Sequence, residues 1–416
     1  MSHWWHKEAR YLELTEYELG QLLIYEQPTA YIVESTEYND NYKTPVLTAG
    51  KSFILGYTNE TENIFDNLPV IIFDDFTTAT QYVNFKFKVK SSAMKILHIN
   101  TELVNPKYIY YRMQIIQFDH STHKRYWIQQ YSKLKVQIPS LPEQKRIVDK
   151  IEELFSDLDN AVETLNATKS QLEVYRQAVI REAFIGAFTE DYRKSNDTTI
   201  NIQLPWADSK QSESLPIIPT SWKYVSLANL GDLGRGKSKH RPRNDARLFE
   251  NGIYPFLQTG EVKAADKYIT DYSKMYNEFG LEQSKLWPKG TLCITIAANI
   301  AETAFLGIDA CFPDSVVGFT AFDFVLPEYV KYFIESQKVR LWTFAPATAQ
   351  KNINLTTLEN LVIPYCNVTE QQEIINEIES RLTVYANIEN TVTSALAQAS
   401  AMRQSILKQA FEGRLI

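Results

Sequence analysis

Two stretches of the chain share one pattern of apolar positions, in which steps of four and three residues alternate with no glycine or proline inside either stretch. The first stretch spans residues 143–184 and the second spans residues 370–411. Alternating steps of four and three are typical of the buried seam of a coiled coil. Gly186 and Gly413 follow the two stretches and fit the C-terminal ends of helices. The pattern therefore predicts two long helices, each of which needs a partner helix to cover its apolar stripe.

The two stretches are copies of one segment, because a constant displacement of 227 residues carries the first onto the second without a gap. An unbroken displacement of this length indicates a duplication. Similar sequences also precede the helices. One of these pairs, the slipped pair, matches only if the displacement is shortened by two residues. The matched segments are Glu143-Gln144 with Glu370-Gln371, Ala183-Phe184 with Ala410-Phe411, Ile138-Pro139 with Ile363-Pro364 (the slipped pair) and Thr44–Gly50 with Tyr254–Gly260. The chain is therefore predicted to repeat a globular part followed by a helical part.

The globular parts mix short β-like runs with one short helix late in each part, which predicts two mixed α/β heads. The first long helix leads from one head to the next, so a second helix that packs along it must run in the opposite direction. We therefore predict an α+β fold, with two mixed α/β domains separated by two long helices that form an antiparallel coiled coil. The alternative is that each helix packs on its own head or on another subunit. The predicted segments are 1–140 (first head), 141–188 (first helix), 189–220 (connection), 221–366 (second head) and 367–416 (second helix).

Composition narrows the class of protein. The length of 416 residues suits two or three domains, and the formal net charge is −7. The three cysteines, Cys293, Cys311 and Cys366, have neither the number for a disulfide framework nor the spacing of a zinc site. The N-terminus lacks the apolar core of a signal peptide, and no apolar stretch is long enough to span a membrane. We therefore expect a cytoplasmic protein that holds no metal and does not enter the membrane.

One motif suggests an enzyme. Gly231–Ser238 fits the pattern G-x-x-x-x-G-K-[ST] of a phosphate-binding loop, and the strand-like run Tyr224–Leu227 precedes it. Such a loop must lead into a helix whose N-terminus faces the phosphate. The residues that follow contain Pro242 and no apolar periodicity, so the required helix is missing. A nucleotide-binding enzyme that uses Lys237 is kept only as an alternative.

Two further motifs are interpreted as structural. Asn105-Pro106-Lys107-Tyr108 is similar to a degraded methyltransferase motif, but the repeat places Leu326 where the first copy has Asn105. Asn105 is therefore predicted to cap a helix that begins at Pro106, and methylation by this chain is not expected. The pair Asp74-Asp75 could bind metal in a nuclease, but we interpret both residues as solvated loop carboxylates.

Positive charge is concentrated in three stretches although the whole chain is acidic. Residues 235–247 carry +5, and residues 85–95 and 123–135 carry +4 each. The first three lysines of 85–95 alternate with apolar residues, which predicts that they share one face of a strand. Clustered charge among aromatic and amide side chains is typical of a nucleic-acid surface. The candidate DNA contacts are Arg235, Lys237, Lys239, His240, Arg241, Arg243, Asn244, Lys351, Lys86, Lys88, Lys90, Lys124 and Arg125.

Each basic stretch also has a plainer interpretation. Alternating lysines can protect an edge strand, and residues 123–135 can form a solvated loop. Residues 235–247 are harder to explain in this way, because their six Lys and Arg side chains repel one another without a counter-surface. These side chains can contact phosphate or guanine, and Asn244 can pair with adenine. The two long helices carry −5 of the total charge of −7, so the acidic total does not exclude DNA.

The chain resembles the specificity subunit of type I restriction–modification systems in the order of its heads and long helices and in their duplication. The resemblance covers essentially the whole chain. The first head departs from it, because residues 11–22 lack the Trp-x-x-Val sequence that opens the second head. Besides the Ile-Pro and Glu-Gln pairs above, the resemblance rests on Pro142-Glu143-Gln144, Ser221–Val225, Gln350–Ile353 and Arg235–Asp245.

The resemblance implies two target-recognition domains, each of which reads half of a bipartite, asymmetric site in double-stranded DNA. It implies spacer helices that set the distance between the half-sites, docking of two adenine-methyltransferase subunits, and docking of restriction subunits that consume ATP. AdoMet, ATP and Mg would then belong to the partner subunits, and this chain would hold no cofactor and catalyse no reaction. A purely structural coiled-coil adaptor is the second alternative, beside the nucleotide-binding enzyme.

Overall fold

The computed structural model describes residues 13–48, 53–119, 125–208, 215–344 and 352–415. The chain forms two compact units, each made of one head and one end of both long helices. Unit 1 comprises the described parts of Met1–Asn166 and Thr393–Ile416, and unit 2 comprises those of Ala167–Val392. The long helices, α3 (Leu141–Ala183) and α11 (Val368–Phe411), each begin in one unit and end in the other. The five segments predicted from the sequence divide the chain differently and remain a prediction.

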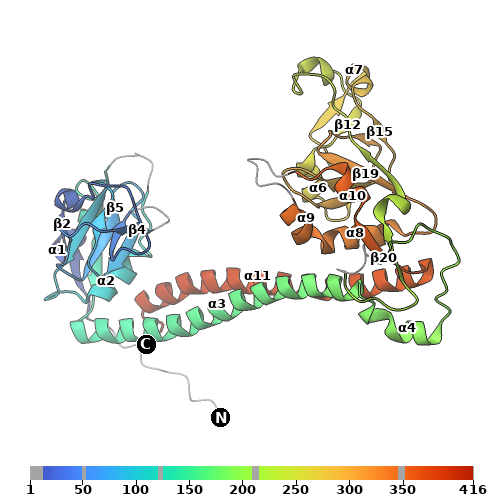
Figure 1. Ribbon diagram of the computed structural model, residues 1–416. Coiled ribbons are helices and arrows are strands. Elements are labelled where there is room, and N and C mark those ends of the chain that lie inside the picture. Colours follow the sequence, from blue (N-terminus) through green and yellow to red (C-terminus); the bar gives the residue numbers. More distant parts are fainter. Residues whose placement is uncertain (1–12, 49–52, 120–124, 209–214, 345–351, 416) are drawn as a thin grey trace, which may run out of the picture. The chain divides into compact units, whose positions relative to one another are not determined.

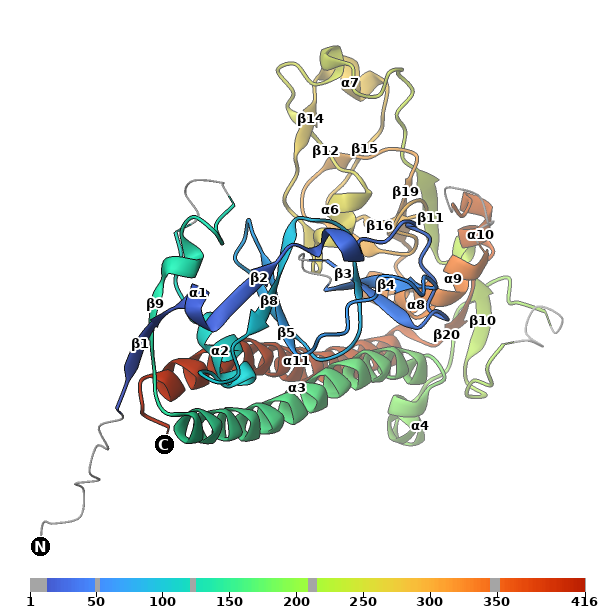
Figure 2. The same cartoon turned by 90° about the vertical axis from the view of Figure 1, so that its left-hand side faces the viewer.

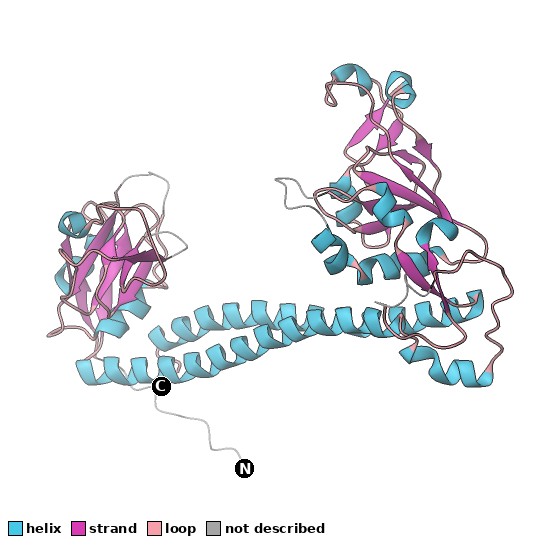
Figure 3. Ribbon diagram, in the orientation of Figure 1, coloured by secondary structure: helices cyan, strands magenta, loops and turns pink. Residues whose placement is uncertain are grey.

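Within its described residues, the first head contains three small sheets (Figures 1 and 3). Its helix α2 (Pro106–Met113) lies between the four-stranded sheet and α3. The predicted cap of α2 is confirmed, because Asn105 accepts hydrogen bonds from the amides of Lys107 (3.0 Å) and Tyr108 (3.1 Å). The sheets, in strand order, are β2 (Leu23–Glu26), β8 (Met94–Ile99), β5 (Val70–Asp74) and β6 (Thr80–Val83); β4 (Ile54–Thr58), β3 (Thr44–Leu47) and β7 (Lys88–Val89); and β1 (Thr15–Glu18) with β9 (Lys135–Ile138). The short helices are α1 (Leu19–Leu22), η1 (Pro28–Tyr31) and η2 (Tyr131–Lys133).

The part of the second head that the structure describes is built in the same way on three sheets. In both views α7 lies at the end of this head that is away from α8 (Figures 1 and 2). The sheets are β11 (Gly231–Arg235), β19 (Val316–Ala321), β16 (Leu292–Thr295), β17 (Thr303–Leu306) and β13 (Tyr268–Ile269); β14 (Lys274–Tyr276), β12 (Tyr254–Phe256), β18 (Ala310–Cys311) and β15 (Leu286–Trp287); and β10 (Lys223–Ser226) with β20 (Val362–Tyr365). The helices are η4 (Leu227–Asn229), η5 (Ala246–Leu248), α6 (Thr259–Ala264), α7 (Glu278–Glu282), α8 (Pro327–Ser336), α9 (Lys338–Phe344) and α10 (Leu355–Glu359), with η3 (Ala187–Thr189) and α4 (Glu190–Ser195) in the connection.

The two heads share one strand topology, so the duplication extends beyond the helices. The order β2-β8-β5-β6 in the first head corresponds to β11-β19-β16-β17 in the second. In the smaller sheets, β3 pairs antiparallel with β4 and parallel with β7, just as β12 pairs with β14 and β18. The resemblance of Thr44–Gly50 to Tyr254–Gly260 therefore reflects equivalent strands. The fold class predicted from the sequence is confirmed.

The strand registers correct one detail of the sequence comparison. The amide of Leu19 donates to the carbonyl of Leu134, and that of Leu227 donates to the carbonyl of Leu361, each at 2.9 Å. Leu134 and Leu361 are 227 residues apart, so the displacement of the helices also holds in β9 and β20. Ile138 is then equivalent to Tyr365, and the two-residue slip between the Ile-Pro pairs is wrong.

Within each unit the ends of α3 and α11 run antiparallel and lie side by side (Figures 1 and 2). In unit 1, Arg403 of α11 pairs with Asp159 of α3 at 2.6 Å, and its guanidinium lies 4.1 Å from the ring centre of Phe155. In unit 2, the hydroxyl of Tyr385 on α11 donates to Glu173 of α3 at 3.1 Å. Further along, Ile180 and Ala183 belong to the same buried cluster as Ile374 and Ile378. The apolar stripes are therefore covered by the partner helix and by the adjacent head.

A buried glutamine holds each head to the start of its long helix. Gln144 donates to the carbonyl of Pro139 at 2.9 Å and accepts from the amide of Asn105 at 2.7 Å. Gln371 repeats this arrangement with the carbonyl of Cys366 (2.8 Å) and the amide of Leu326 (2.9 Å). Satisfied buried amides of this kind specify a single geometry. The Gln of the repeated Glu-Gln pair is therefore structural in both halves.

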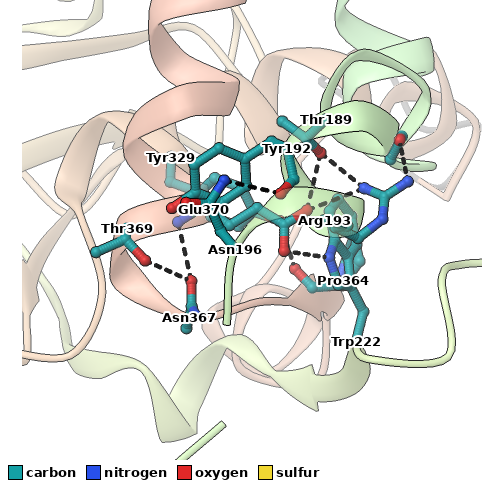
Figure 4. Close-up of polar contacts among 11 residues, drawn as sticks. Thr189, Tyr192, Arg193, Asn196, Trp222, Tyr329, Pro364, Asn367, Thr369 and Glu370 are labelled. Carbon is teal, nitrogen blue, oxygen red and sulfur yellow. Dashed lines mark hydrogen bonds and ion pairs between the residues drawn. The ribbon is translucent and has the colours of Figure 1, made fainter. Parts of the chain in front are cut away.

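The Glu of the repeated pair behaves differently in the two halves. Glu370 is fully buried and accepts hydrogen bonds from Thr189 (2.8 Å), Arg193 (2.9 Å) and the indole of Trp222 (2.9 Å), as Figure 4 shows. Its counterpart Glu143 has a side chain that is 28% exposed and lies 3.4 Å from the Nε atom of Arg146. The buried Oε2 atom of Glu143 accepts no hydrogen bond. Residue 14, the position equivalent to Trp222, is a leucine.

Candidate nucleic-acid interface

The basic stretch of the second head is a loop that begins at the end of β11 and lies beside α7. The amide of Gly236 donates to the carbonyl of Val316, and that of Lys239 donates to the carbonyl of Gln283. A side chain at position 236 would collide with the carbonyl oxygens of Phe312 and Pro313, so glycine is required by close packing. Two neighbouring segments therefore hold the first part of the loop in a defined path.

Most cations of the loop are held by oxygen atoms. Arg235 donates to the carbonyl of Asp314 through Nε (2.9 Å) and Nη2 (2.6 Å), and Nη2 of Arg243 donates to both carboxylate oxygens of Asp314 (2.9 and 3.0 Å). Arg241 donates to the carbonyls of Ser238 and His240. These bonds leave further N–H groups on each guanidinium. The repulsion expected among the like charges is therefore reduced by carbonyls and by Asp314.

Asp245 organises the second part of the loop. Its carboxylate lies 2.7 Å from Nε2 of His240 and 2.7 Å from Nη2 of Arg247, and its side chain is 14% exposed. The hydrogen bonds from Arg247 and then from His240 lower the pKa of Asp245 well below its usual value. The carboxylate of Asp245 is therefore ionised in the folded protein near neutral pH. His240, predicted as a DNA contact, is tied to this cluster.

Lys237, Lys239 and Asn244 are exposed on the same loop. Neither lysine forms an ion pair with a described residue, and the carbonyl of Lys237 accepts from the hydroxyl of Ser284. Asn244 borders a shallow hollow with Phe249, Ser273, Lys274 and Met275. An exposed ammonium without a carboxylate partner is suited to a phosphate oxygen. The structure thus brings the seven candidate residues of 235–244 together on one loop.

Gly231–Ser238 does not have the strand–loop–helix geometry of a phosphate-binding loop. Gly231–Arg235 is strand β11, which pairs with β19, and the short η5 (Ala246–Leu248) is the next helical segment. Gly234 packs against Trp287, where an added Cβ would lie 2.8 Å from the ring. Gly231–Arg235 is therefore part of a sheet, the amide of Gly236 donates to the carbonyl of Val316, and no helix directly follows Ser238. The glycines serve close packing.

In the first head the predicted strand of alternating lysines is largely wrong. β7 is only Lys88–Val89, and Lys88 is 3% exposed. Its ammonium lies 2.7 Å from Glu60 and donates to the carbonyl of Glu62 at 2.9 Å. Burial raises the pKa of Glu60, but the hydrogen bonds from Lys88 and from two backbone amides outweigh it and lower the pKa overall. Lys88 is therefore too buried to contact a phosphate, and we no longer expect it to contact DNA.

The other described candidates of the first head are exposed. Lys86 is exposed and lies 3.3 Å from Asp66, and Lys90 and Arg125 are exposed. Lys124, like Lys351 of the second head, lies outside the described residues. The segment that follows β2, at the position of the basic loop, is residues 27–43, which carry three acids and one base. The first head therefore has no counterpart of the basic loop at that position.

The pair Asp74-Asp75 also differs from its prediction. Asp75 is 2% exposed, accepts from the amide of Trp127 at 2.8 Å and lies 3.5 Å from the buried ammonium of Lys95. Asp74 accepts from the amides of Phe76 and Thr77 in the turn after β5. Asp75 is therefore a core residue with its charge paired, and the prediction of two solvated carboxylates is wrong for it. Among the described residues, no group of three or more His, Cys, Asp or Glu side chains could hold a metal.

Sequence reasoning missed Asp314, which lies in the turn between β18 and β19 and holds two arginines of the loop. No sequence signal links it to Arg243, because 71 residues separate them. None of the helices in the described ranges is both long enough and apolar enough to cross a bilayer.

The fold defines a class of protein: a duplicated chain whose mixed α/β heads are carried on paired long helices, with a basic loop on the second head. The family described as "Type I restriction modification DNA specificity domain" matches residues 12–174 and 219–397. The chain belongs to this family.

Several relatives are similar over much of the chain. It is 30% identical to the specificity subunit of the type I restriction enzyme EcoR124I/EcoR124II of Escherichia coli, with 93% of this chain and 90% of that protein covered. It is 25% identical to the EcoKI specificity subunit of Escherichia coli strain K12, with 68% and 58% covered.

Solved structures show the same fold. One chain from a study of complex assembly and conformational transition of the type I R-M system covers 96% of this chain and 98% of its own length (TM-score 0.70, 16% identity). The HsdS subunit from Thermoanaerobacter tengcongensis covers 96% and 97% (TM-score 0.53, 16% identity).

Proposed function

We propose that this chain gives a type I restriction–modification complex its DNA sequence specificity by reading a bipartite site, one half-site per head. The observation that carries this proposal is the duplication: each unit repeats the same head topology on the same glutamine-anchored helix start. Two similar heads on one chain bind two half-sites with an effective-concentration gain that neither head has alone. The antiparallel helices fix the separation of the half-sites that can be bound together.

In the second head, the loop of residues 235–247 enters the major groove. Lys237 and Lys239 bind phosphate, while Arg241, Arg243 and Asn244 read base edges. The first head uses other residues, among which Lys86, Lys90 and Arg125 are exposed cations. The difference in charge between the two equivalent loops supports an asymmetric site, whose halves are read by different chemistry.

The chain itself is non-catalytic and holds no cofactor. Two methyltransferase subunits dock on it, flip the target adenine and bind AdoMet, and restriction subunits bind ATP and Mg. The complex works in the cytoplasm. This division of roles is supported by family membership and by the use of the Gly231–Ser238 glycines in sheet packing.

Replacing Arg241 or Arg243 by alanine is expected to weaken binding of the cognate duplex by about 1–3 kcal/mol each, because each removes a side chain that reads a base. Binding is measured by titration of labelled duplex in the assembled complex. Lys289→Ala, which removes an exposed lysine at the β15–β16 turn, is the matched control. Unchanged affinity in both arginine variants would show that the loop does not read the site.

The proposed function itself is tested by methylome sequencing of a host with and without this chain. We expect a two-part adenine-methylation motif that is present only with the chain. If the methylome is the same in both hosts, the proposal is wrong. ATP binding by the isolated chain that is lost in Lys237→Ala would favour the nucleotide-binding enzyme instead.

A further inference from the structure

We propose that Asp314 is a positioning residue for DNA reading by the second head: it holds the Arg243 guanidinium in the orientation in which its remaining N–H groups meet the base edge. This inference rests on the proposed function and adds to it a residue that itself need not touch DNA. The contact is specific in form, since one nitrogen of Arg243, Nη2, donates to both carboxylate oxygens at 2.9 and 3.0 Å.

Asp314 lies on a firmly anchored turn. Phe312 and Val316, which flank it by two residues on each side, are completely buried. The ring of Phe312 stacks on Trp287 with ring centres 5.1 Å apart, and the amide of Val316 donates to the carbonyl of Pro313. The same turn receives the loop, because Gly236 donates to the carbonyl of Val316. The carboxylate of Asp314 therefore has a fixed position relative to the start of the basic loop.

The pair leaves Arg243 able to bind. A guanidinium has five N–H groups, and the two on Nη2 are used by Asp314, so Nε and Nη1 keep three. Those donors can serve the acceptors of guanine or a phosphate oxygen while Asp314 stays in place. Arg243 is 49% exposed and Asp314 is 42% exposed, so the contact lies at the surface where a duplex can reach it.

The advantage of such a pair is preorganisation. A free arginine must give up several rotamers when it binds one base, and that cost is absent if the side chain is already held. An ion pair this exposed contributes little to folding stability. Loss of the carboxylate should therefore leave the head folded and affect DNA reading instead.

The backbone carbonyl of Asp314 gives an internal control. It accepts two hydrogen bonds from Arg235, and these bonds remain when the side chain is changed to asparagine. Asp314→Asn thus removes the charge beside Arg243 without removing the acceptor for Arg235. Asp232, an exposed carboxylate on β11 that forms no ion pair with a described residue, provides the matched variant Asp232→Asn with the same change in net charge.

The test is a selection of bound duplexes from a library with a randomised central region, using the assembled complex that contains the full chain and sequencing the bound fraction. For Asp314→Asn we expect discrimination at one or two positions of one half-site to fall about 2- to 12-fold, which corresponds to the cost of ordering one long side chain. The other half-site should stay as sharp as in the unmodified chain, and Asp232→Asn should change neither half. In the Arg243→Ala background, Asp314→Asn should have no further effect.

The outcomes separate the two proposals. If the complex with the unmodified chain enriches no two-part motif, the proposed function fails and this inference fails with it. If the motif is found but is equally sharp with Asp314→Asn, only the inference is wrong. An effect of Asp314→Asn that persists in the Arg243→Ala background would also overturn it, because Asp314 would then act through another group.

Discussion

Replacing Glu370 by alanine is expected to lower the free energy of unfolding of unit 2 by about 3–5 kcal/mol, because it leaves a buried charge without its partner. Arg193, which is 15% exposed, pairs with Glu370 at 2.9 Å, and the indole of Trp222 donates to the same carboxylate. Both donors would lose their acceptor in an interior that cannot replace it with water. Hydrogen exchange measured by mass spectrometry, peptide by peptide, reports the two units separately.

The duplication supplies the control for this experiment. Glu143 stands at the equivalent position in unit 1, but its side chain is partly exposed and its buried oxygen accepts no hydrogen bond. Glu143→Ala is therefore expected to change the exchange of unit 1 far less than Glu370→Ala changes that of unit 2. Equal effects in the two units would contradict the role given to Glu370. Replacing Glu370 and Arg193 together by methionine should restore much of the loss, since no charge is then left unpaired.

Removing one heptad from each long helix is expected to abolish binding of the original site and to select a site with a shorter spacer. Residues 163–169 and 391–397 are suitable, since they lie along the chain between the Asp159–Arg403 pair and the Glu173–Tyr385 hydrogen bond. A heptad keeps the apolar seam in phase. At 1.5 Å per residue each helix loses about 10 Å, which is about three base pairs at 3.4 Å per pair.

The spacer is read from the methylome of a host that carries the shortened chain. Substituting the same fourteen residues without changing the length is the control and should leave the spacer as it was. A shortened chain that methylates sites with the original spacing would refute the proposal that the helices fix the separation of the half-sites.

The long helices, the duplication and the fold class could be predicted from the sequence because each has a local or periodic cause. An apolar step of four and three residues depends only on the geometry of one helix. A constant displacement of 227 residues needs no structure to be seen. The cap at Asn105 and the failure of the phosphate-binding pattern after Ser238 likewise depend on a few adjacent residues.

The side-chain partners could not be predicted in this way. Lys86, Lys88 and Lys90 are equivalent in the sequence, yet Lys88 is buried because the chain brings Glu60 to 2.7 Å from its ammonium. Asp75 is buried for the corresponding reason, since Lys95 lies 3.5 Å away. Whether a charge faces solvent or the core depends on which opposite charge the fold places beside it, because an unpaired charge is too costly to bury.

The sequence alone thus determined that this protein has two similar heads on two long helices, and that positive charge gathers in residues 235–247. The tertiary structure decided which of those charges are held and by what, including the pairing of Arg243 with Asp314 across 71 residues. It also decided that two glutamates at equivalent positions differ, since only Glu370 meets Thr189, Arg193 and Trp222. The physical reason is that helix periodicity is a property of neighbours in the chain, whereas ion pairs and buried hydrogen bonds join residues that only the folded chain brings within about 3 Å of each other.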